Sequence, residues 1–283
     1  MNEDITGKIL KKLKEQQKEE GKLPLLLEFY RKLLQIQSAA RKQIKPLAAV
    51  LNGEDIQSRL TGGQTLIKFD ELNLDMTLLR NLFVEVIAVF AGYEELFGEL
   101  PGRLKKADAG LLLTGEAVKD WFIGNPLPAA LAADISAKLI QTMVQAALYP
   151  FLNSHAQALQ ESMQPPLLEG WRREYCPFCG GGPDMAYLEK EVGARWLVCS
   201  RCDSAWPYQR LQCPYCGTQD QRTMAFFMDE SGLYRLQVCN DCKSYLKTLD
   251  LRKTEGEVLL PLERVLTVEM DRQARKEGYK FPF

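Results

Sequence analysis

All eight cysteines of this 283-residue chain fall in four CxxC pairs, and all of them lie between residues 176 and 242. Disulfide frameworks spread cysteines through small secreted domains, whereas paired CxxC motifs in an intracellular chain are typical of metal sites. Nineteen residues separate the first two pairs, 22 separate the last two, and 10 separate the two sets. We therefore predict two ions, each held by four thiolates. The predicted ligands are Cys176, Cys179, Cys199 and Cys202, then Cys213, Cys216, Cys239 and Cys242.

The first pair of each set has the sequence of a metal knuckle, CPFCG from Cys176 and CPYCG from Cys213. Proline fixes one backbone angle, and Gly180 or Gly217 permits the left-handed conformation that closes the loop. Two knuckles complete a tetrahedron around one ion, and four thiolates suit both zinc and iron. The short gap between the sets favours sequential grouping, with interleaved grouping of the first and third knuckles as the alternative.

Between the knuckles, the sequence predicts two hairpins. Residues 185–189 and 195–198 have the composition of paired strands. Residues 223–228 and 233–238 flank the turn-forming sequence Asp-Glu-Ser-Gly. We therefore predict two rubredoxin-like zinc ribbons in tandem.

The first 170 or so residues contain no cysteine and show helical periodicity. Apolar residues at helical spacing predict one helix that opens at Pro24 and a second that stops at Gly92. A third helix is predicted to start near Pro126 or Pro128 and to break or kink at Pro150. Several one-sided helices must share a core, which favours a bundle of about six to eight helices.

The helical patterning stops near residues 164–166, where a stretch rich in Cys, Gly and aromatic residues begins. The predicted fold class is α+β multidomain, with an all-α N-terminal domain, two tandem rubredoxin-like zinc-ribbon modules and a C-terminal helix. The predicted domains are a helical domain at 1–168, metal ribbons at 169–211 and 212–254, and a helical tail at 255–283.

The distribution of apolar residues argues against membrane insertion and export. The N-terminus is too polar to contain the apolar core of a secretory signal. The longest apolar runs, such as residues 146–152, fall far short of the roughly 20 residues that cross a bilayer. We expect a cytoplasmic protein without a transmembrane segment.

The residue inventory argues against an enzyme. His155 is the single histidine and no cysteine lies outside the pairs, so Cys-His catalysis has no components and His155 is expected to be structural. Closed four-thiolate sites also leave no open position for substrate. A rubredoxin-like thiol or iron redox protein remains an alternative.

Charge argues against nucleic-acid binding. Residues 171–253 contain 12 Lys and Arg against 10 Asp and Glu. Each four-thiolate site with a divalent ion carries a further −2, so this region is acidic overall, whereas proteins that hold phosphate backbones show a basic surplus. A zinc-ribbon nucleic-acid-binding protein is therefore the less favoured alternative.

The ordered motifs from Cys176 to Tyr279 resemble the FdhE-type formate dehydrogenase accessory protein family. The resemblance is strong over residues 171–283 and general before that. Two positions depart from the family pattern: the last knuckle lacks glycine, and Glu263-Arg264 replaces an acidic pair. The residues that carry the resemblance are CPFCG from Cys176, Pro183, GARWLVC from Gly193, Trp206, RLQC from Arg210, CNDCKSYLK from Cys239, Asp271 and Glu277-Gly278-Tyr279.

The resemblance implies a cytoplasmic maturation protein that binds the catalytic subunit of a respiratory formate dehydrogenase and supports its assembly before export. Iron bound in rubredoxin style is part of that implication, and a homodimer is left open. Aromatic and Arg side chains are favoured at binding hot spots. We expect Arg210 and Lys247 to be exposed, and burial is the alternative for the tryptophans. The candidates for partner contact are Trp196, Trp206, Arg210, Tyr245 and Lys247.

Overall fold

The structure is a computed structural model that describes residues 5–46, 51, 53–106, 108–163 and 168–282. The chain divides into two compact units. Unit 1 comprises Met1–Pro46 and Phe69–Ser154, and unit 2 comprises Leu47–Lys68 and His155–Phe283. The change of composition noted near residues 164–166 lies outside the described residues, and the four domain ranges given above stay predictions.

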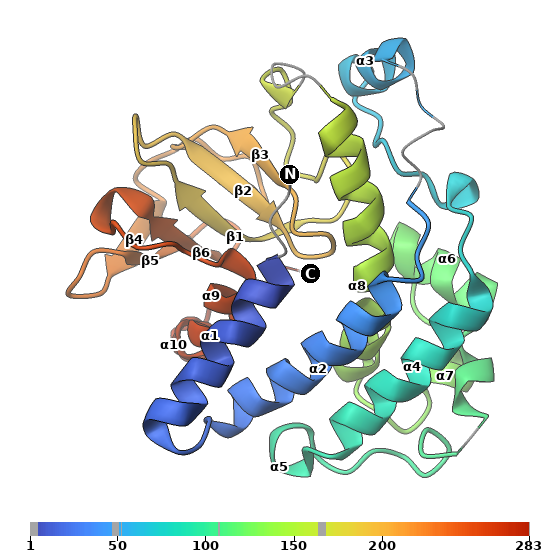
Figure 1. Ribbon diagram of the computed structural model, residues 1–283. Coiled ribbons are helices and arrows are strands. Elements are labelled where there is room, and N and C mark those ends of the chain that lie inside the picture. The colour runs from blue at the N-terminus through green and yellow to red at the C-terminus, as the bar shows by residue number, and fades with distance from the viewer. Residues whose placement is uncertain (1–4, 47–50, 52, 107, 164–167, 283) are drawn as a thin grey trace. The chain divides into compact units, whose positions relative to one another are not determined.

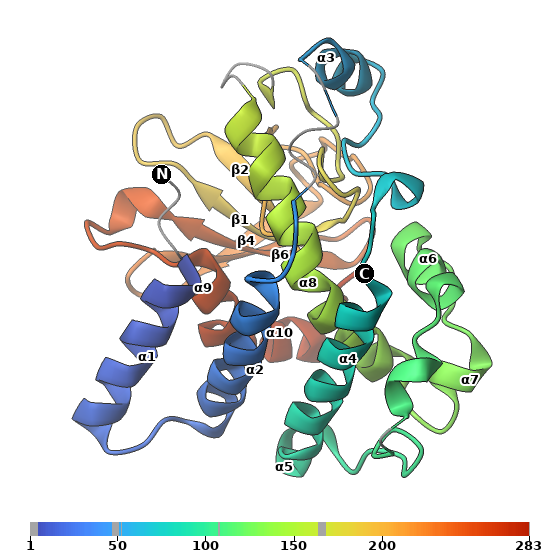
Figure 2. The same cartoon turned by 45° about the vertical axis from the view of Figure 1, so that its right-hand side comes forward.

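The regular elements described in unit 1 are helical, as Figure 1 shows. Helices α2 and α4 lie side by side in both views (Figures 1 and 2). Phe29 of α2 packs edge-on against Phe90 of α4, with ring centroids 4.9 Å apart. Asp75 caps α4 by accepting hydrogen bonds from the backbone amides of Thr77 and Leu78. The elements are α1 (Ile5–Glu20), α2 (Leu25–Arg41), η1 (Phe69–Glu71), α4 (Met76–Ala91), α5 (Glu94–Phe97), η2 (Ala109–Leu112), α6 (Gly115–Ile123), α7 (Ala129–Ala132) and α8 (Ala137–Ser162), which ends in unit 2.

The first two predicted helices are confirmed, because α2 begins directly after Pro24 and α4 ends at its C-cap, Gly92. The polar segment that forms α1 was not predicted as a helix, because its apolar stripe is narrow: its buried residues are Ile9 and Leu13.

The prediction for the third helix is wrong at its start, and the break predicted as one outcome at Pro150 does not occur. Residues after Pro128 form only the short α7, and α8 begins separately at Ala137. Pro150 lies inside α8, which continues to Ser162. Proline has no N–H to donate to the carbonyl four residues earlier. Here the side-chain amide of Gln37 donates to that carbonyl, Ala146 O, at 2.7 Å, so the helix passes through the proline with this acceptor satisfied.

Unit 2 contains one six-stranded sheet with the order β3-β2-β1-β6-β5-β4. Neighbouring strands run antiparallel, except that β1 and β6 run parallel. Its other elements are α3 (Gly53–Thr61), η4 (Leu251–Lys253), α9 (Leu260–Leu266) and α10 (Val268–Lys276). The strands are β1 (Pro183–Leu188), β2 (Arg195–Cys199), β3 (Ala205–Tyr208), β4 (Met224–Met228), β5 (Tyr234–Cys239) and β6 (Ser244–Asp250).

Both predicted hairpins are confirmed, as β1–β2 and β4–β5. The predicted fold class is also confirmed, with a helical N-terminal region, two four-cysteine modules and C-terminal helices. The third strand of each module and the joining of both modules into one sheet were not predicted, since the β1–β6 pairing links residues far apart in the sequence.

The strand pairings repeat with an offset of forty residues. Arg195 lies opposite Tyr208 in the first module, and Arg235 lies opposite Thr248 in the second. The second strand of each module ends on a cysteine, Cys199 or Cys239. Strands β1, β2 and β3 therefore correspond to β4, β5 and β6.

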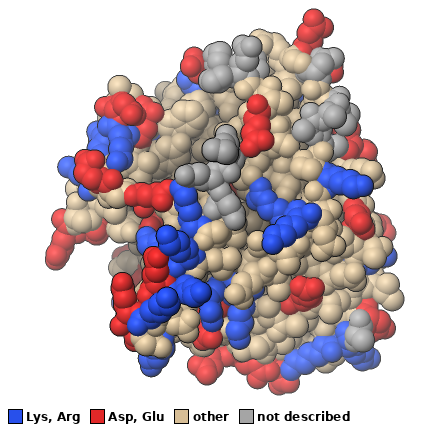
Figure 3. Space-filling model, in the orientation of Figure 1, with Lys and Arg blue, Asp and Glu red and all other residues tan. Residues whose placement is uncertain are grey.

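One face of the sheet packs against the C-terminal helices, which lie beneath it in Figures 1 and 2. Tyr245 and Val238 contact Ala274 and Met270 of α10 there. None of the helices in the described part of the chain has the length and apolar character that crossing a bilayer requires. On the face shown in Figure 3, basic and acidic side chains are interspersed.

Candidate metal centres

The first four-cysteine group is compact and sealed from solvent. Its sulfur atoms lie 3.6 Å apart between Cys176 and Cys202, 3.4 Å between Cys179 and Cys199, and 3.5 Å between Cys179 and Cys202. All four side chains are buried.

The second group has similar spacing and a different exposure. Its sulfur atoms lie 3.8 Å apart between Cys213 and Cys242 and 3.7 Å between Cys216 and Cys239. Cys216 is exposed and Cys242 is half-buried, while the other two are buried. Solvent therefore reaches the second group and not the first.

Both groups fit a tetrahedral ion. Four sulfurs at the zinc–thiolate distance of about 2.3 Å around one centre lie about 3.8 Å from one another. The five separations given above, 3.4–3.8 Å, match that value and are far longer than a disulfide bond of about 2.05 Å, and all the sulfur atoms of a group lie within 4.8 Å of one another. The cysteines are grouped sequentially, as their spacing favoured. Each group can hold zinc or iron, because four thiolates suit both.

The first knuckle of each group closes through a glycine, as predicted. In the first group, the amide of Gly180 donates to Cys176 O at 3.0 Å, and Gly180 has φ of +73°. In the second group, Gly217 donates to Cys213 O at 3.1 Å with φ of +74°. This left-handed backbone is accessible to glycine without steric cost.

The second knuckle of each group reaches the same conformation without glycine. Asp203 has φ of +60° and Lys243 has φ of +55°, each directly after the last cysteine of its group. Residues with a Cβ rarely adopt this region unless the surrounding structure holds them there. Lys243 is held by its neighbours, because its carbonyl accepts a hydrogen bond from the amide of Lys280 at 2.7 Å.

Burial changes the acidity of the thiols. It raises the pKa of Cys176 and of Cys213 well above the ordinary value, and in both groups neighbouring sulfurs raise it further. Thiols such as those of Cys176 and Cys213 become thiolates when a cation compensates their charge, whereas hydrogen bonds with Ser244 and with neighbouring sulfurs lower the pKa of Cys242 despite its burial. Metal uptake at these sites therefore releases protons.

The C-terminal helices fasten the first group in place. Arg264 of α9 forms two hydrogen bonds with Asp184 of β1, at 2.5 and 3.0 Å, and a third with Asp203 at 2.8 Å. It also donates to the carbonyl of Cys199 at 3.3 Å. Arg264 is one of the two departures from the family pattern, and here it ties α9 to a cysteine knuckle.

Asp271 of α10 has the same role toward the second module. Tyr245 and Lys247 of β6 donate to its carboxylate at 2.9 and 2.7 Å. Beyond α10, the hydroxyl of Tyr279 donates to Asn240 Oδ1 at 2.9 Å. Several residues that carry the family resemblance thus join the C-terminal segment to the sheet.

The five candidates for partner contact are not equally accessible. Trp206 is fully buried and donates to Arg173 O at 2.9 Å. Tyr245 and Lys247 are also buried, so the expectation that Lys247 is exposed is wrong: the carboxylate of Asp271 compensates its charge. Trp196 is half-buried, and Arg210 is exposed as expected.

A segment that sequence reasoning assigned to the helical domain supports the first knuckle. The amides of Leu66 and Ile67 donate to Pro177 O and Phe178 O at 2.9 and 2.8 Å. Tyr175 donates to Gly63 O at 2.8 Å. Consecutive glycines such as Gly62-Gly63 are typical of a loop, but nothing in the composition of this segment links it to the cysteines.

His155 is buried in α8 and lies in no four-cysteine group. Burial lowers its pKa from 6.5 to about 4, so the ring is neutral near pH 7.

Comparisons with known proteins agree with this architecture. The family model described as FdhE, central domain, matches residues 175–210, which contain the first cysteine group. A protein FdhE homolog from Aquifex aeolicus is 26% identical over 258 residues, covering 90% of this chain and 85% of that protein. Protein FdhE from Escherichia coli O1:K1 is 30% identical over 112 residues, covering 39% of this chain and 36% of that protein.

One solved structure resembles the whole chain. The crystal structure of the FdhE protein from Pseudomonas aeruginosa aligns with a TM-score of 0.59 and 21% identity, covering 98% of this chain and 92% of that one. At this identity the likeness is one of fold.

Proposed function

Because this chain is a protein of the FdhE family, we propose that it is an accessory protein for a formate dehydrogenase. In this proposal it is not a catalyst: it binds the catalytic subunit in the cytoplasm and supports its assembly before export. The observation that carries the proposal is the match to an FdhE homolog over 90% of the chain.

In this proposal the eight cysteines hold two ions of zinc or iron. The sulfur spacing supports this assignment, because the separations within each group fit tetrahedral coordination. The ions would fix the knuckles that end β2 and β5 and so stabilise a sheet that the C-terminal helices cover on one face.

The accessible members of the predicted contact set are Trp196 and Arg210. We assign partner contact to these two. Trp196 stacks on Tyr187 with their planes 3° apart, a pre-ordered aromatic surface of the kind found at binding hot spots. A polypeptide partner is favoured over nucleic acid, because acidic and basic groups are interspersed on the face in Figure 3.

The test is co-purification. The tagged protein, expressed with a formate dehydrogenase catalytic subunit that still carries its export signal, should retain that subunit. Deletion of its gene should lower the formate dehydrogenase activity of the membrane fraction, and re-expression should restore it. Full activity without the protein, together with no retained subunit, would refute the proposal.

A second candidate function is a rubredoxin-like redox role, favoured by the exposure of Cys216 in the second group. It predicts a visible absorbance band from thiolate-to-iron charge transfer after anaerobic purification, with reversible bleaching on reduction. A protein that contains only zinc would exclude this role and leave the accessory function intact.

A further inference from the structure

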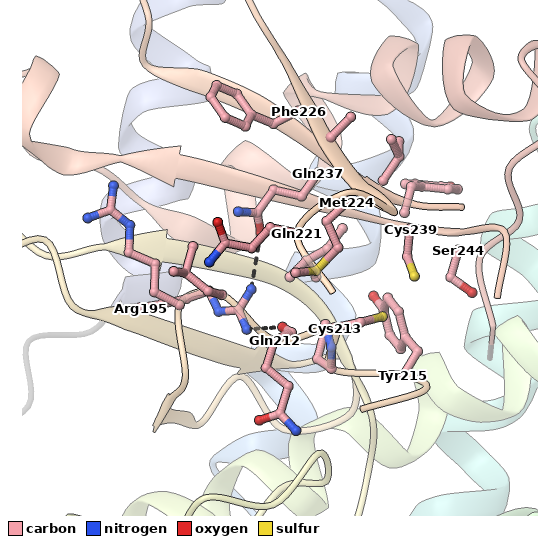
Figure 4. A pocket seen from close by; sticks show the side chains of 17 residues that line it. Arg195, Gln212, Cys213, Tyr215, Gln221, Met224, Phe226, Gln237, Cys239 and Ser244 are labelled. Atoms are coloured by element: carbon pink, nitrogen blue, oxygen red, sulfur yellow. Dashed lines mark hydrogen bonds between the residues drawn. The ribbon is translucent and has the colours of Figure 1, made fainter. Parts of the chain in front are cut away.

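A small pocket lies beside the second cysteine group, two of whose members, Cys213 and Cys239, line it. Its volume is about 230 Å³, which is below the roughly 300–1,000 Å³ of small-molecule sites and suits a single side chain. Figure 4 shows it between β4, β5 and the loop that carries Gln212 and Cys213. The lining residues that matter below are Arg195, Arg210, Met224, Phe226 and Gln237.

The repeat shows that this pocket lacks the carboxylate that is present in the other module. Arg235 is paired with the carboxylate of Asp250, which is fully buried. With the offset of forty residues, Arg195 corresponds to Arg235, and Arg210 stands where the second module has Asp250. Among the described residues that line the pocket there is no Asp or Glu. An arginine–aspartate pair in one module is thus two arginines in the other.

Arg195 is buried with its hydrogen-bonding capacity only partly used. It is 3% exposed, and its guanidinium donates to Gln237 Oε1 at 3.3 Å and to the carbonyl of Gln212, as Figure 4 shows. It also donates to the carbonyl of Gln209. Its Nε has no hydrogen-bond partner. Burial lowers the pKa of Arg195 to about 10; Tyr208, Cys213 and Tyr215 oppose this shift, and the charge of Arg210 adds a smaller contribution in the same direction as burial. The thiolate ligands Cys213 and Cys239 also line the pocket, but neither offers the paired oxygen acceptors with which a bound carboxylate would hold the two guanidinium groups.

Strand β4, which forms one wall of the pocket, is an edge strand with an apolar exposed surface. Phe226, Phe227 and Met228 are each more than half exposed. The amide of Asn240 donates to Thr223 O, and that of Asp229 donates to Tyr234 O, so these two positions of the β4 segment face β5. Antiparallel ladders alternate, so the backbone groups of residues 224, 226 and 228 point away from the sheet. Unpaired edges of this kind accept a further strand.

The first module already carries a strand at the equivalent edge. Strand β1, the counterpart of β4, pairs in parallel with β6 from Met185 opposite Lys247 to Leu188 opposite Asp250. The same fold of strand and knuckle therefore accommodates a parallel neighbour at this edge.

We propose that the free edge of β4 and the adjoining pocket form one peptide-binding site, which takes an extended acidic segment of the client polypeptide as a parallel strand. Backbone hydrogen bonds to residues 224, 226 and 228 hold the segment. Phe226 and Met228 cover its apolar side chains, and an Asp or Glu side chain enters the pocket toward Arg195 and Arg210. The identity of the client rests on the proposed function.

The test uses overlapping peptides that tile the formate dehydrogenase catalytic subunit, with binding to the full-length, metal-loaded protein measured by fluorescence anisotropy. Bound peptides should contain Asp or Glu, and replacing that residue by its amide should weaken binding about tenfold or more. Arg210→Asp restores the charge pattern of the other module, so it should keep the fold, with an unchanged or higher melting temperature, and weaken binding to a similar extent.

Two further variants separate edge pairing from general charge. Met228→Pro removes one outward-facing N–H without touching the bonds to β5, and it should also weaken binding. Lys276→Asp makes the same change of charge as Arg210→Asp on the exposed end of α10, and it should bind like the unmodified protein.

Three outcomes would overturn the inference. If the full-length subunit co-purifies but no peptide binds, or if Arg210→Asp leaves peptide binding unchanged, this site is wrong while the accessory function stands. Self-association that Met228→Pro abolishes would make a second copy the occupant of the edge. Peptide binding without retention of the full-length subunit would count against the accessory function instead.

Discussion

The side-chain amide of Gln37 donates a hydrogen bond to the carbonyl of Ala146 across 2.7 Å, where Pro150 leaves that carbonyl without its helical donor. Gln37 is 6% exposed, so water does not readily replace it. A buried acceptor that loses its partner costs about 1–3 kcal/mol. A side chain on α2 thus supplies the hydrogen-bond donor that Pro150 removes from α8.

We expect Gln37→Leu to destabilise the protein by about 1–3 kcal/mol, because it leaves Ala146 O unsatisfied. The same substitution should cost much less in a Pro150→Ala background, where the alanine amide can donate to that carbonyl. Urea unfolding followed by circular dichroism of the four proteins measures the coupling. Equal costs in both backgrounds would show that Gln37 acts by packing alone.

Metal removal should occur in two steps. The second cysteine group should lose its ion first, because Cys216 is exposed and Cys242 is half-buried, whereas all four thiols of the first group are buried. A chelator that reports released metal should show a fast and a slow phase. Mass spectrometry of alkylated thiols, sampled between the phases, should find Cys216 and Cys242 modified before Cys176. Simultaneous modification of both groups would contradict this order.

Arg264→Met should loosen the contact between α9 and the first cysteine group and cost about 2–3 kcal/mol, because it strands two largely buried carboxylates, Asp184 and Asp203. Arg272→Met is a matched control. Arg272 pairs with Glu269 on the surface, where the two side chains are 64% and 76% exposed, respectively. This pairing should therefore contribute less than about 1 kcal/mol to stability. Thermal unfolding and the amide hydrogen exchange of α9 should be measured for both variants. Equal destabilisation by Arg264→Met and Arg272→Met would refute the role of Arg264.

His155 should make the protein less stable in mild acid. Its pKa is about 4 when folded and 6.5 in its ordinary state, so below pH 6.5 the unfolded chain binds the proton more readily. Stability should fall as the pH decreases from about 6.5 to 4, by on the order of 3 kcal/mol from this residue.

In His155→Gln, the free energy of unfolding should fall by about 3 kcal/mol less than in the unmodified protein between pH 6.5 and pH 4. Because the chain contains one histidine, its ring signal in a proton NMR titration is unambiguous. A signal that titrates near pH 6.5 in the folded protein would contradict this prediction.

Sequence patterns predicted those features that depend on residues close together in the chain. CxxC spacing gave the two cysteine groups, and glycine after the second cysteine gave the left-handed turns at Gly180 and Gly217. Strand-like composition gave the first hairpin, and the turn sequence Asp-Glu-Ser-Gly gave the second. These features depend on residues that are close in the sequence, so a single chain reveals them.

The rest depends on residues that are distant in the sequence. Asp203 and Lys243 adopt a glycine-like backbone because surrounding contacts hold them. Lys247 is buried because Asp271 lies against it, and α8 passes through Pro150 because Gln37 reaches Ala146. Each of these departures from a local rule requires a partner that local pattern cannot identify.

The parallel pairing of β1 with β6 couples the stability of the two modules. Four residue pairs join a strand of the sealed module to the strand that follows the last cysteine of the solvent-reached one. When β6 loses its anchor, β1 loses a neighbour along its length. Loss of an ion from the second group would therefore weaken the pairing beside the first group, so that the slow release from the buried thiols would follow the fast release and depend on it.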